Sequence, residues 1–261
     1  MKKFLLNRDF ILFAIICIGL ISVGFANPLF ITPSSISDVL TDTSILIILA
    51  LSQMIVILIR AIDLSVASNL ALSGMLISLL STVYPELPVY YFIALSCIIG
   101  TILGVLNGVS IAILKVPFIV TTLGTMSIYR GLIYFVSDGK QVYSSEFSED
   151  FLDLIHFKFL SLSFLFWLAV AVFIIFYILL NHTRFGRNLY SLGGNPDAAK
   201  YIGINENKYI ILAYSISGLF AGLCGYLWVA RYSVASTQIA IGFELTVISA
   251  CVVGGISVMG G

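Results

Sequence analysis

Seven polar side chains stand inside or between long apolar stretches of this sequence, where they could bind a polar solute or one another. They comprise one carboxylate, one guanidinium, two amides and three hydroxyls, carried by Asp63, Ser65, Asn69, Asn107, Thr121, Thr122 and Arg130. Charged groups within a bilayer are costly, and they usually face a partner or a water-filled cavity. For Arg60 and Asp63 we expect an ion pair or a cap at a tight turn. For Asn107, Thr121 and Thr122 two interpretations stay open: hydrogen bonds between helices, or the lining of a path.

Other kinds of chemistry find no support in the sequence. It has no ladder of carboxylates and no histidine cluster that would suggest a proton relay, and no Ser/His/Asp set, phosphate-cradling glycine loop or zinc motif. The four cysteines lie in apolar runs without metal-ligand spacing, at Cys17, Cys97, Cys224 and Cys251. We therefore expect a non-enzyme with no metal, no cofactor and no ATP site on this chain.

A polar insert at His182–Lys208 contains a short, well-delimited helix. Asn195 is a good N-cap, Pro196 suits the first helical position, and Asp197 complements the positive helix start. Gly203 supplies a C-terminal stop. A helix of this size between two apolar runs is too small to be a domain, and we expect it to insert into a socket on another protein.

The elements around these residues are typical of a membrane protein. Hydrophobic residues make up 60% of the 261 residues and charged residues only 10%, whereas a soluble domain is about one quarter charged. The net charge of zero gives no reason to expect a nucleic-acid partner. Eight apolar runs predict an all-α, polytopic helix bundle with about eight spans, at residues 10–26, 44–59, 64–83, 89–114, 117–136, 160–180, 209–230 and 244–258.

Charge placement orients these spans. If Lys2, Lys3 and Arg8 precede the first span in the cytoplasm, nine basic residues fall in cytoplasmic segments, three in external loops, and Arg130 within a span. This bias agrees with the positive-inside rule. It predicts a cytoplasmic N-terminus and a cytoplasmic location for the insert.

Glycines at four-residue spacing predict close helix packing. Gly100, Gly104 and Gly108 mark one face of the fourth span, and Gly218 and Gly222 mark one face of the seventh. Small residues let helices approach closely where packing, rather than hydrophobicity, drives association.

Three segments carry a resemblance to a known family. Ala61–Ser68 is similar to its Gly-Ile-Asp-Leu-Ser-Val-Gly-Ser motif, a second segment runs from Gly104 to Gly131, and a third runs from Gly186 to Ile204. By these segments the chain resembles the permease subunit of bacterial ABC importers for monosaccharides, of the ribose, xylose and rhamnose type. Arg60-Ala61, where many members have glycines, leans toward the rhamnose branch.

The resemblance implies that residues 1–261 form a single permease domain in the bacterial inner membrane. Since members have about ten spans, we expect this chain to be truncated at its C-terminus. The implied partners are a cytoplasmic ABC ATPase that binds ATP and Mg, a second permease in a homo- or heterodimer, an extracytoplasmic sugar-binding protein, a monosaccharide and the lipid bilayer. The third segment resembles the loop that docks on the ATPase, which gives the coupling residues Gly186, Arg187, Gly194, Asn195, Pro196, Asp197, Ala198, Ala199, Gly203 and Ile204. The seven polar side chains named first are the expected path residues. Asn107, Thr121 and Thr122 are the best candidates among them, because neutral hydroxyl and amide groups suit a sugar.

Two alternatives remain. One is the permease of a related importer, for autoinducer 2 or for branched-chain amino acids; the motif at Ala61–Ser68 argues against the amino-acid branch. The other is a self-contained secondary transporter, which would need coupling-ion sites at broken helices in matched halves. No such pair is legible in the sequence.

Overall fold

A computed structural model describes residues 8–260 of the chain. Lys2 and Lys3, on which part of the predicted orientation rests, and Gly261 lie outside the described residues. The chain divides into two compact units, Met1–Thr43 and Ser44–Gly261. The first unit holds α2 (Arg8–Ala26), η1 (Pro28–Ile31) and the start of α3 (Pro33–Leu58).

Local signals delimit the elements of the first unit. The Asn27 side chain accepts a hydrogen bond from the Leu29 backbone N–H at 3.1 Å, and Pro28 occupies the first position of η1. Gly24 leaves room for the Ile31 side chain, because a Cβ at Gly24 would lie 2.0 Å from Ile31 Cδ1. The chain between α2 and α3 therefore turns through a capped, closely packed 3-10 segment.

The second unit confirms the all-α prediction. After α3 it contains α4 (Val66–Val83), α5 (Val89–Ala112), α6 (Phe118–Ser137), α7 (Glu149–His156), α8 (Phe164–His182), α9 (Arg184–Gly194), α10 (Pro196–Tyr201), α11 (Glu206–Tyr232) and α12 (Phe243–Val253). Within the described part of the chain, six helices are long and apolar enough to cross a membrane: α3, α4, α5, α6, α8 and α11. The first and last of the eight predicted runs form shorter apolar helical stretches, Ala14–Ala26 and Phe243–Val253.

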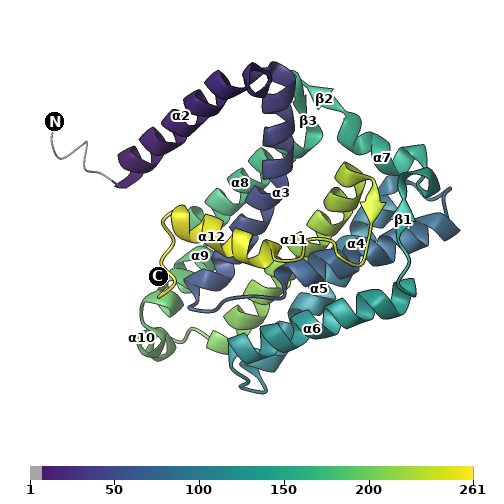
Figure 1. Cartoon of the computed structure of the whole chain (residues 1–261). Helices are drawn as coiled ribbons and strands as arrows, with labels where there is room; N and C mark the ends of the chain where they lie inside the picture. The colour runs from purple at the N-terminus through teal and green to yellow at the C-terminus, as the bar shows by residue number, and fades with distance from the viewer. Residues whose placement is uncertain (1–7, 261) are drawn as a thin grey trace. The chain divides into compact units, whose positions relative to one another are not determined.

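Helix α4 is the centre of the second unit and contacts α5, α6 and α11 (Figure 1). Its interior holds small polar residues as well as aliphatic ones, since Ser68, Asn69 and Ser73 are buried beside Leu70 and Met75. Each of these buried polar side chains has a hydrogen-bond partner within or next to the helix. The core of this protein is thus partly polar, as expected where helices rather than water must satisfy such groups.

The predicted glycine faces of α5 and α11 meet. A Cβ at Gly104 would lie 2.2 Å from the Tyr214 carbonyl oxygen, and one at Gly218 would lie 2.3 Å from the Gly100 carbonyl oxygen. Ser96 Oγ also donates across this contact to the Gly222 carbonyl at 2.5 Å. The two backbones are therefore so close that no side chain fits between them, which confirms the prediction of tight packing.

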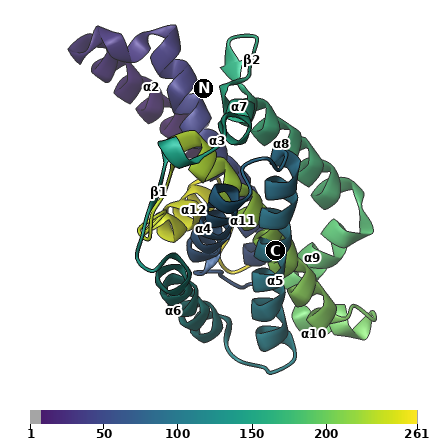
Figure 2. The same cartoon turned by 90° about the vertical axis from the view of Figure 1, so that its right-hand side faces the viewer.

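Short strands connect helix ends. β1 (Val142–Tyr143) pairs antiparallel with β4 (Val234–Ala235), and β2 (Lys158–Phe159) pairs with β3 (Leu162–Ser163). The β2–β3 turn places Leu160 and Ser161 at φ +52° and +63°, the left-handed conformation that a two-residue hairpin requires. Figure 2 shows the β1 strand at the opposite end of the second unit from α9 and α10. The sequence did not indicate these strands.

The insert contains two helices where one was predicted. Thr183 caps α9 by accepting from the Gly186 N–H at 3.3 Å, and Leu189 and Leu192 are buried. Gly186 permits this start, since a Cβ there would lie 2.0 Å from the Leu180 carbonyl oxygen. Burial of these two leucines stabilises this second helix, which the sequence analysis did not predict.

Candidate functional site: a docking helix and a polar network

The predicted helix of the insert is present as α10, with the predicted ends. Asn195 Oδ1 accepts from the Ala198 N–H at 3.0 Å, Pro196 is the first helical residue, and Asp197 lies in the first turn. Gly203 has φ +84°, a conformation that glycine adopts without strain, and its N–H donates to the Lys200 carbonyl at 3.1 Å. The helix therefore has a fixed start and end.

The predicted coupling residues differ in exposure. Gly186 and Ala199 are buried, Pro196 and Ile204 are half-buried, and the exposed members are Arg187, Gly194, Asn195, Asp197, Ala198 and Gly203. Buried Ala199 holds α10 against the protein, whereas exposed Ala198 is available to a partner. The predicted coupling residues thus divide into buried ones, which hold α10 against the protein, and exposed ones, which are available to a partner.

Two residues that the sequence analysis did not select dominate the surface of this helix. Tyr201 is 92% exposed and Ile202 is 73% exposed, side by side at its C-terminal end. Large apolar side chains that project together into water mark interaction sites, and aromatic residues are enriched in interface cores. We call Tyr201 and Ile202 the apolar tip. Their apolar type, at the end of a short capped helix, was the signal that could have identified them.

Arg60 connects α10 to the interior of the bundle. It lies in the turn between α3 and α4, with φ +62°, and donates from Nε to the Gly193 carbonyl at 2.6 Å and from Nη2 to the Gly194 carbonyl at 2.7 Å. These are carbonyls at the C-terminal end of α9, where a cation also complements the helix dipole. These two hydrogen bonds from one guanidinium, which we call the Arg60 fork, tie the α3–α4 turn to the residues directly before α10.

The predicted pairing of Arg60 with Asp63 is only half correct. Asp63 forms the cap, because its Oδ1 accepts from the Ser65 N–H at 2.9 Å and from Ser65 Oγ at 2.6 Å. Arg60 instead finds its partners in α9, which lies 133 residues further along the chain. Burial raises the pKa of the Asp63 carboxyl, and the hydrogen bonds from Ser65 oppose that rise.

Asp63, Ser65 and Asn107 form one buried network. Ser65 Oγ accepts from Asn107 Nδ2 at 2.7 Å while it donates to Asp63, and Ser217 Oγ donates to the other Asp63 oxygen at 3.5 Å. Tyr214 OH donates to the Ile62 carbonyl of the same turn at 3.3 Å. The network therefore joins the α3–α4 turn to both α5 and α11. Asn107 therefore makes a hydrogen bond between helices, which is one of the two interpretations that the sequence left open for it.

The other predicted path residues lie apart from this network. Asn69 Nδ2 donates to the Gly100 carbonyl at 3.0 Å, and Thr122 Oγ1 donates to the Phe118 carbonyl of its own helix at 2.9 Å. Thr121 Oγ1 is buried and has no hydrogen-bond partner among the described residues. Arg130 lies further along α6, where it lines a cavity. Contact of any of these side chains with a solute stays a prediction.

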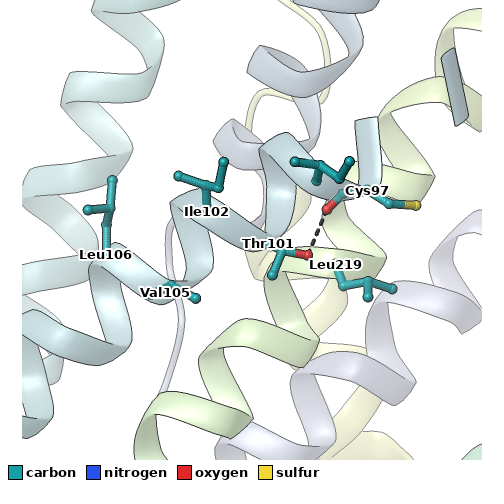
Figure 3. A pocket seen from close by; sticks show the side chains of 7 residues that line it. Cys97, Thr101, Ile102, Val105, Leu106 and Leu219 are labelled. Carbon is teal, nitrogen blue, oxygen red and sulfur yellow. Dashed lines mark hydrogen bonds between the residues drawn. The ribbon is translucent and has the colours of Figure 1, made fainter. Parts of the chain in front are cut away.

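A groove along α5 is a poor match to a polar solute. Figure 3 shows its lining, in which Ile102, Val105, Leu106 and Leu219 leave an apolar surface. The hydroxyl of Thr101 donates to the Cys97 carbonyl of the same helix at 2.7 Å. Lipid tails suit such a surface, and it gives no reason to place a hydrogen-bonding ligand there.

The chain is similar to known proteins over almost its whole length. Residues 35–261 match the family described as branched-chain amino acid transport system / permease component. The chain is 36% identical over 262 residues to a ribose import permease protein of Haemophilus influenzae, covering 99% of this chain and 80% of that protein. It is 35% identical to an L-arabinose ABC transporter permease protein of Azospirillum brasilense, covering 98% and 74%. It is 34% identical to an autoinducer 2 import system permease protein of Photorhabdus luminescens, covering 98% and 76%. No solved structure matches.

Proposed function

This chain belongs to the family described as branched-chain amino acid transport system / permease component, and we propose that it forms the path of an ATP-driven monosaccharide importer and docks on a separate ATPase. The chain is a multi-pass membrane protein and the permease subunit of an ABC sugar importer, a transport subunit rather than an enzyme. The relatives named for sugars match it almost from end to end, which favours a sugar over an amino acid as cargo.

The finer parts of the proposal concern orientation and partners. The excess of basic residues on one side supports an N-terminus and an α10 that are both cytoplasmic, in a bacterial inner membrane. The single observation that carries docking is the apolar tip on a capped helix outside the candidate spans. ATP and Mg then belong to the ATPase, and a second permease and an extracytoplasmic sugar-binding protein complete the assembly.

An uptake measurement tests this function. The chain is purified from its native membrane with the proteins that accompany it, reconstituted in proteoliposomes, and supplied with labelled D-ribose or L-arabinose and the sugar-binding protein. We expect uptake only when ATP is present on the α10 side. Uptake driven by an ion gradient without ATP would identify a secondary transporter instead.

The Arg60 fork suggests how ATPase movement reaches the bundle. A shift of α10 pulls on Gly193 and Gly194, and Arg60 passes that shift to the turn that carries Asp63 and its network. Coupling between two distant sites needs an element with two arrangements, and each site must be able to shift the balance between them. We infer that Arg60 is a positioning residue for coupling, without contact to the sugar.

Replacing Arg60 with glycine should separate ATP hydrolysis from transport. Glycine accepts the positive φ of this position, so the change removes the fork without straining the backbone. Each hydrogen bond from a charged group contributes about 1.5–3 kcal/mol, and we expect sugar uptake to fall roughly tenfold or more. ATP hydrolysis and ATPase co-purification should persist. Arg60→Lys, which cannot form the same planar fork, should restore uptake only in part.

Lys115→Gly is the matched control for this variant. Lys115 is also basic and also has a positive φ, +57°, and it donates to Asn207 Oδ1 at 2.7 Å in another turn of the second unit. We expect this variant to retain most of its uptake. Equal losses in Lys115→Gly and Arg60→Gly would assign the effect to general loosening of the turns rather than to coupling.

A further inference from the structure

A cavity of about 280 Å³, with a mostly apolar lining that includes four polar side chains, lies between α6 and the segment that leads into α12. One wall is formed at four-residue spacing along α6 by Met126, Arg130 and Tyr134, and the other is formed by Thr237, Ile241, Gly242 and Glu244. We call it the α6–α12 cavity. Its volume is close to the lower end for small-molecule sites, which suits a ligand smaller than a drug.

Arg130 fixes the second wall of this cavity. Its Nη1 donates to the Ile239 carbonyl at 2.5 Å, and its Nη2 donates to the Ala240 carbonyl at 3.1 Å. Ala240 and Gly242 have φ values of +52° and +79°, so the chain turns sharply here before α12 begins. The guanidinium therefore holds the turn that places Thr237 and Glu244 opposite α6. Since it has five N–H groups and uses two of them here, it keeps donors for a ligand.

The cavity presents polar groups that lack partners among the described residues. The Thr237 side chain is only 7% exposed, and its hydroxyl forms no described hydrogen bond. The half-buried Glu244 carboxylate likewise accepts no described hydrogen bond, although Arg130 is near enough to attract it. A hydroxyl and a carboxylate that share a cavity and form no described hydrogen bond are available to a polar ligand, the hydroxyl as donor and acceptor and the carboxylate as acceptor.

The two charged groups of the cavity argue against lipid tails as its contents. Helix α6 is a candidate membrane span, and a guanidinium and a carboxylate that faced hydrocarbon together would be strongly unfavourable. Such groups at membrane depth face water or one another. We therefore expect the cavity to open toward an aqueous path rather than toward the bilayer.

The charges of the cavity favour a neutral ligand rich in hydroxyls. An anion would meet the Glu244 carboxylate, and a cation would meet the Arg130 guanidinium. A polyol can donate to the carboxylate and to Thr237 while it accepts from the guanidinium and from the Tyr134 hydroxyl. A zwitterionic amino acid is the one competing ligand of similar size, because its two charges could pair with Arg130 and Glu244.

We propose that the α6–α12 cavity is a transient binding site for a monosaccharide on its way through the permease, with Arg130, Tyr134, Thr237 and Glu244 as the hydrogen-bonding groups. The inference rests on the proposed function, which it deepens by naming where the cargo binds. Binding must be weak here, because a permeation path has to release its cargo.

Protection of a cysteine placed in the cavity tests the proposal. Thr237→Cys is made in a background where Cys17, Cys97, Cys224 and Cys251 are alanine, and the assembled importer is treated with a membrane-impermeant thiol reagent. We expect aqueous labelling that D-ribose or L-arabinose slows. A sugar at about four times its Kd leaves one site in five open and slows labelling about fivefold. Ser145→Cys, exposed in a turn outside the cavity, should be labelled at the same rate with and without sugar.

Each contrary outcome overturns a defined part of the proposal. No labelling of Thr237→Cys, with Ser145→Cys labelled, would show that the cavity is not aqueous. Labelling that no sugar slows would exclude sugar binding, and protection by leucine alone would assign the cavity to an amino acid. Sugar uptake by the cysteine-free background is measured in parallel. It tests the proposed function separately, because uptake can persist when the cavity proves empty.

Two conservative substitutions keep the test independent of the cysteine background. Thr237→Val removes only the hydroxyl, and Glu244→Gln removes the charge at nearly constant shape. A hydrogen bond between a site and a substrate hydroxyl contributes about 1 kcal/mol or more, so we expect maximal uptake to fall roughly fivefold in each. ATPase co-purification should be unchanged. Wild-type uptake in both variants would contradict the assignment.

Discussion

Gly104→Ala is expected to unfold or severely destabilise the second unit of this protein. The new Cβ would lie 2.2 Å from the Tyr214 carbonyl oxygen and 3.0 Å from Gly218 Cα, both backbone atoms that cannot rotate away. Helices α5 and α11 would have to separate, and the hydrogen bond from Asn107 to Ser65 spans the same region. Overpacking of a tight core costs about 1–3 kcal/mol, and a backbone clash of this size lies at the upper end or beyond.

Gly131→Ala is the matched control for the packing prediction. Gly131 is also a glycine inside a candidate span, on α6, but a Cβ there would meet nothing within 4 Å. Because alanine favours helix by about 1 kcal/mol over glycine, this control should be as stable as the native protein or more so. The measurement is the fraction of purified protein that stays monodisperse in mild detergent after heating. Equal survival of the two variants would show that α5 and α11 are not packed as closely as described.

Local patterns predicted the features that depend on local chemistry. The cap and stop of α10 follow from Asn195, Pro196 and Gly203, whose preferences act within a few residues. The contact of the two glycine faces could be expected because four-residue spacing puts glycines on one side of a helix. Composition alone separated this membrane bundle from a soluble domain.

Features that depend on distant partners could not be predicted. Arg60 was expected beside Asp63, its neighbour in sequence, but the fold brings it to Gly193 and Gly194. The α6–α12 cavity likewise depends on a turn held by a side chain more than a hundred residues earlier, since Arg130 binds the carbonyls of Ile239 and Ala240. No periodicity in the sequence carries such information, because it arises only when helices pack.

The exposure of the apolar tip could not be predicted from the sequence either. Tyr201 and Ile202 continue the apolar pattern of a short helix, and either could have been buried like Ala199. Only the packing of α10 decides which of its residues face the protein. The predicted coupling residues therefore included those that hold α10 in place, but not its two exposed large apolar side chains.

Replacing the apolar tip with aspartate should release the ATPase. Tyr201→Asp and Ile202→Asp in one chain remove both projecting apolar side chains and add two negative charges, at positions 92% and 73% exposed. Since both side chains are largely exposed, folding and membrane insertion should be unaffected. Interface anchors of this kind contribute about 2 kcal/mol or more each, so affinity should fall at least about thirtyfold from either change alone and up to roughly a thousandfold if the two effects add.

Leu160→Asp provides the control for charge and polarity. Leu160 is 72% exposed in the β2–β3 turn, and its positive φ suits aspartate as well as leucine. It belongs to the loops that the charge distribution assigns to the other side of the membrane. This variant should bind the ATPase as the native chain does.

The decisive measurement is the amount of ATPase recovered per permease when tagged chains are purified from native membranes in mild detergent. If a separate ATPase drives this permease through α10, the ratio is the same for the native chain and Leu160→Asp, and the ATPase is almost completely lost from the Tyr201→Asp, Ile202→Asp chain. Undiminished recovery of the ATPase with that double variant would contradict this mechanism.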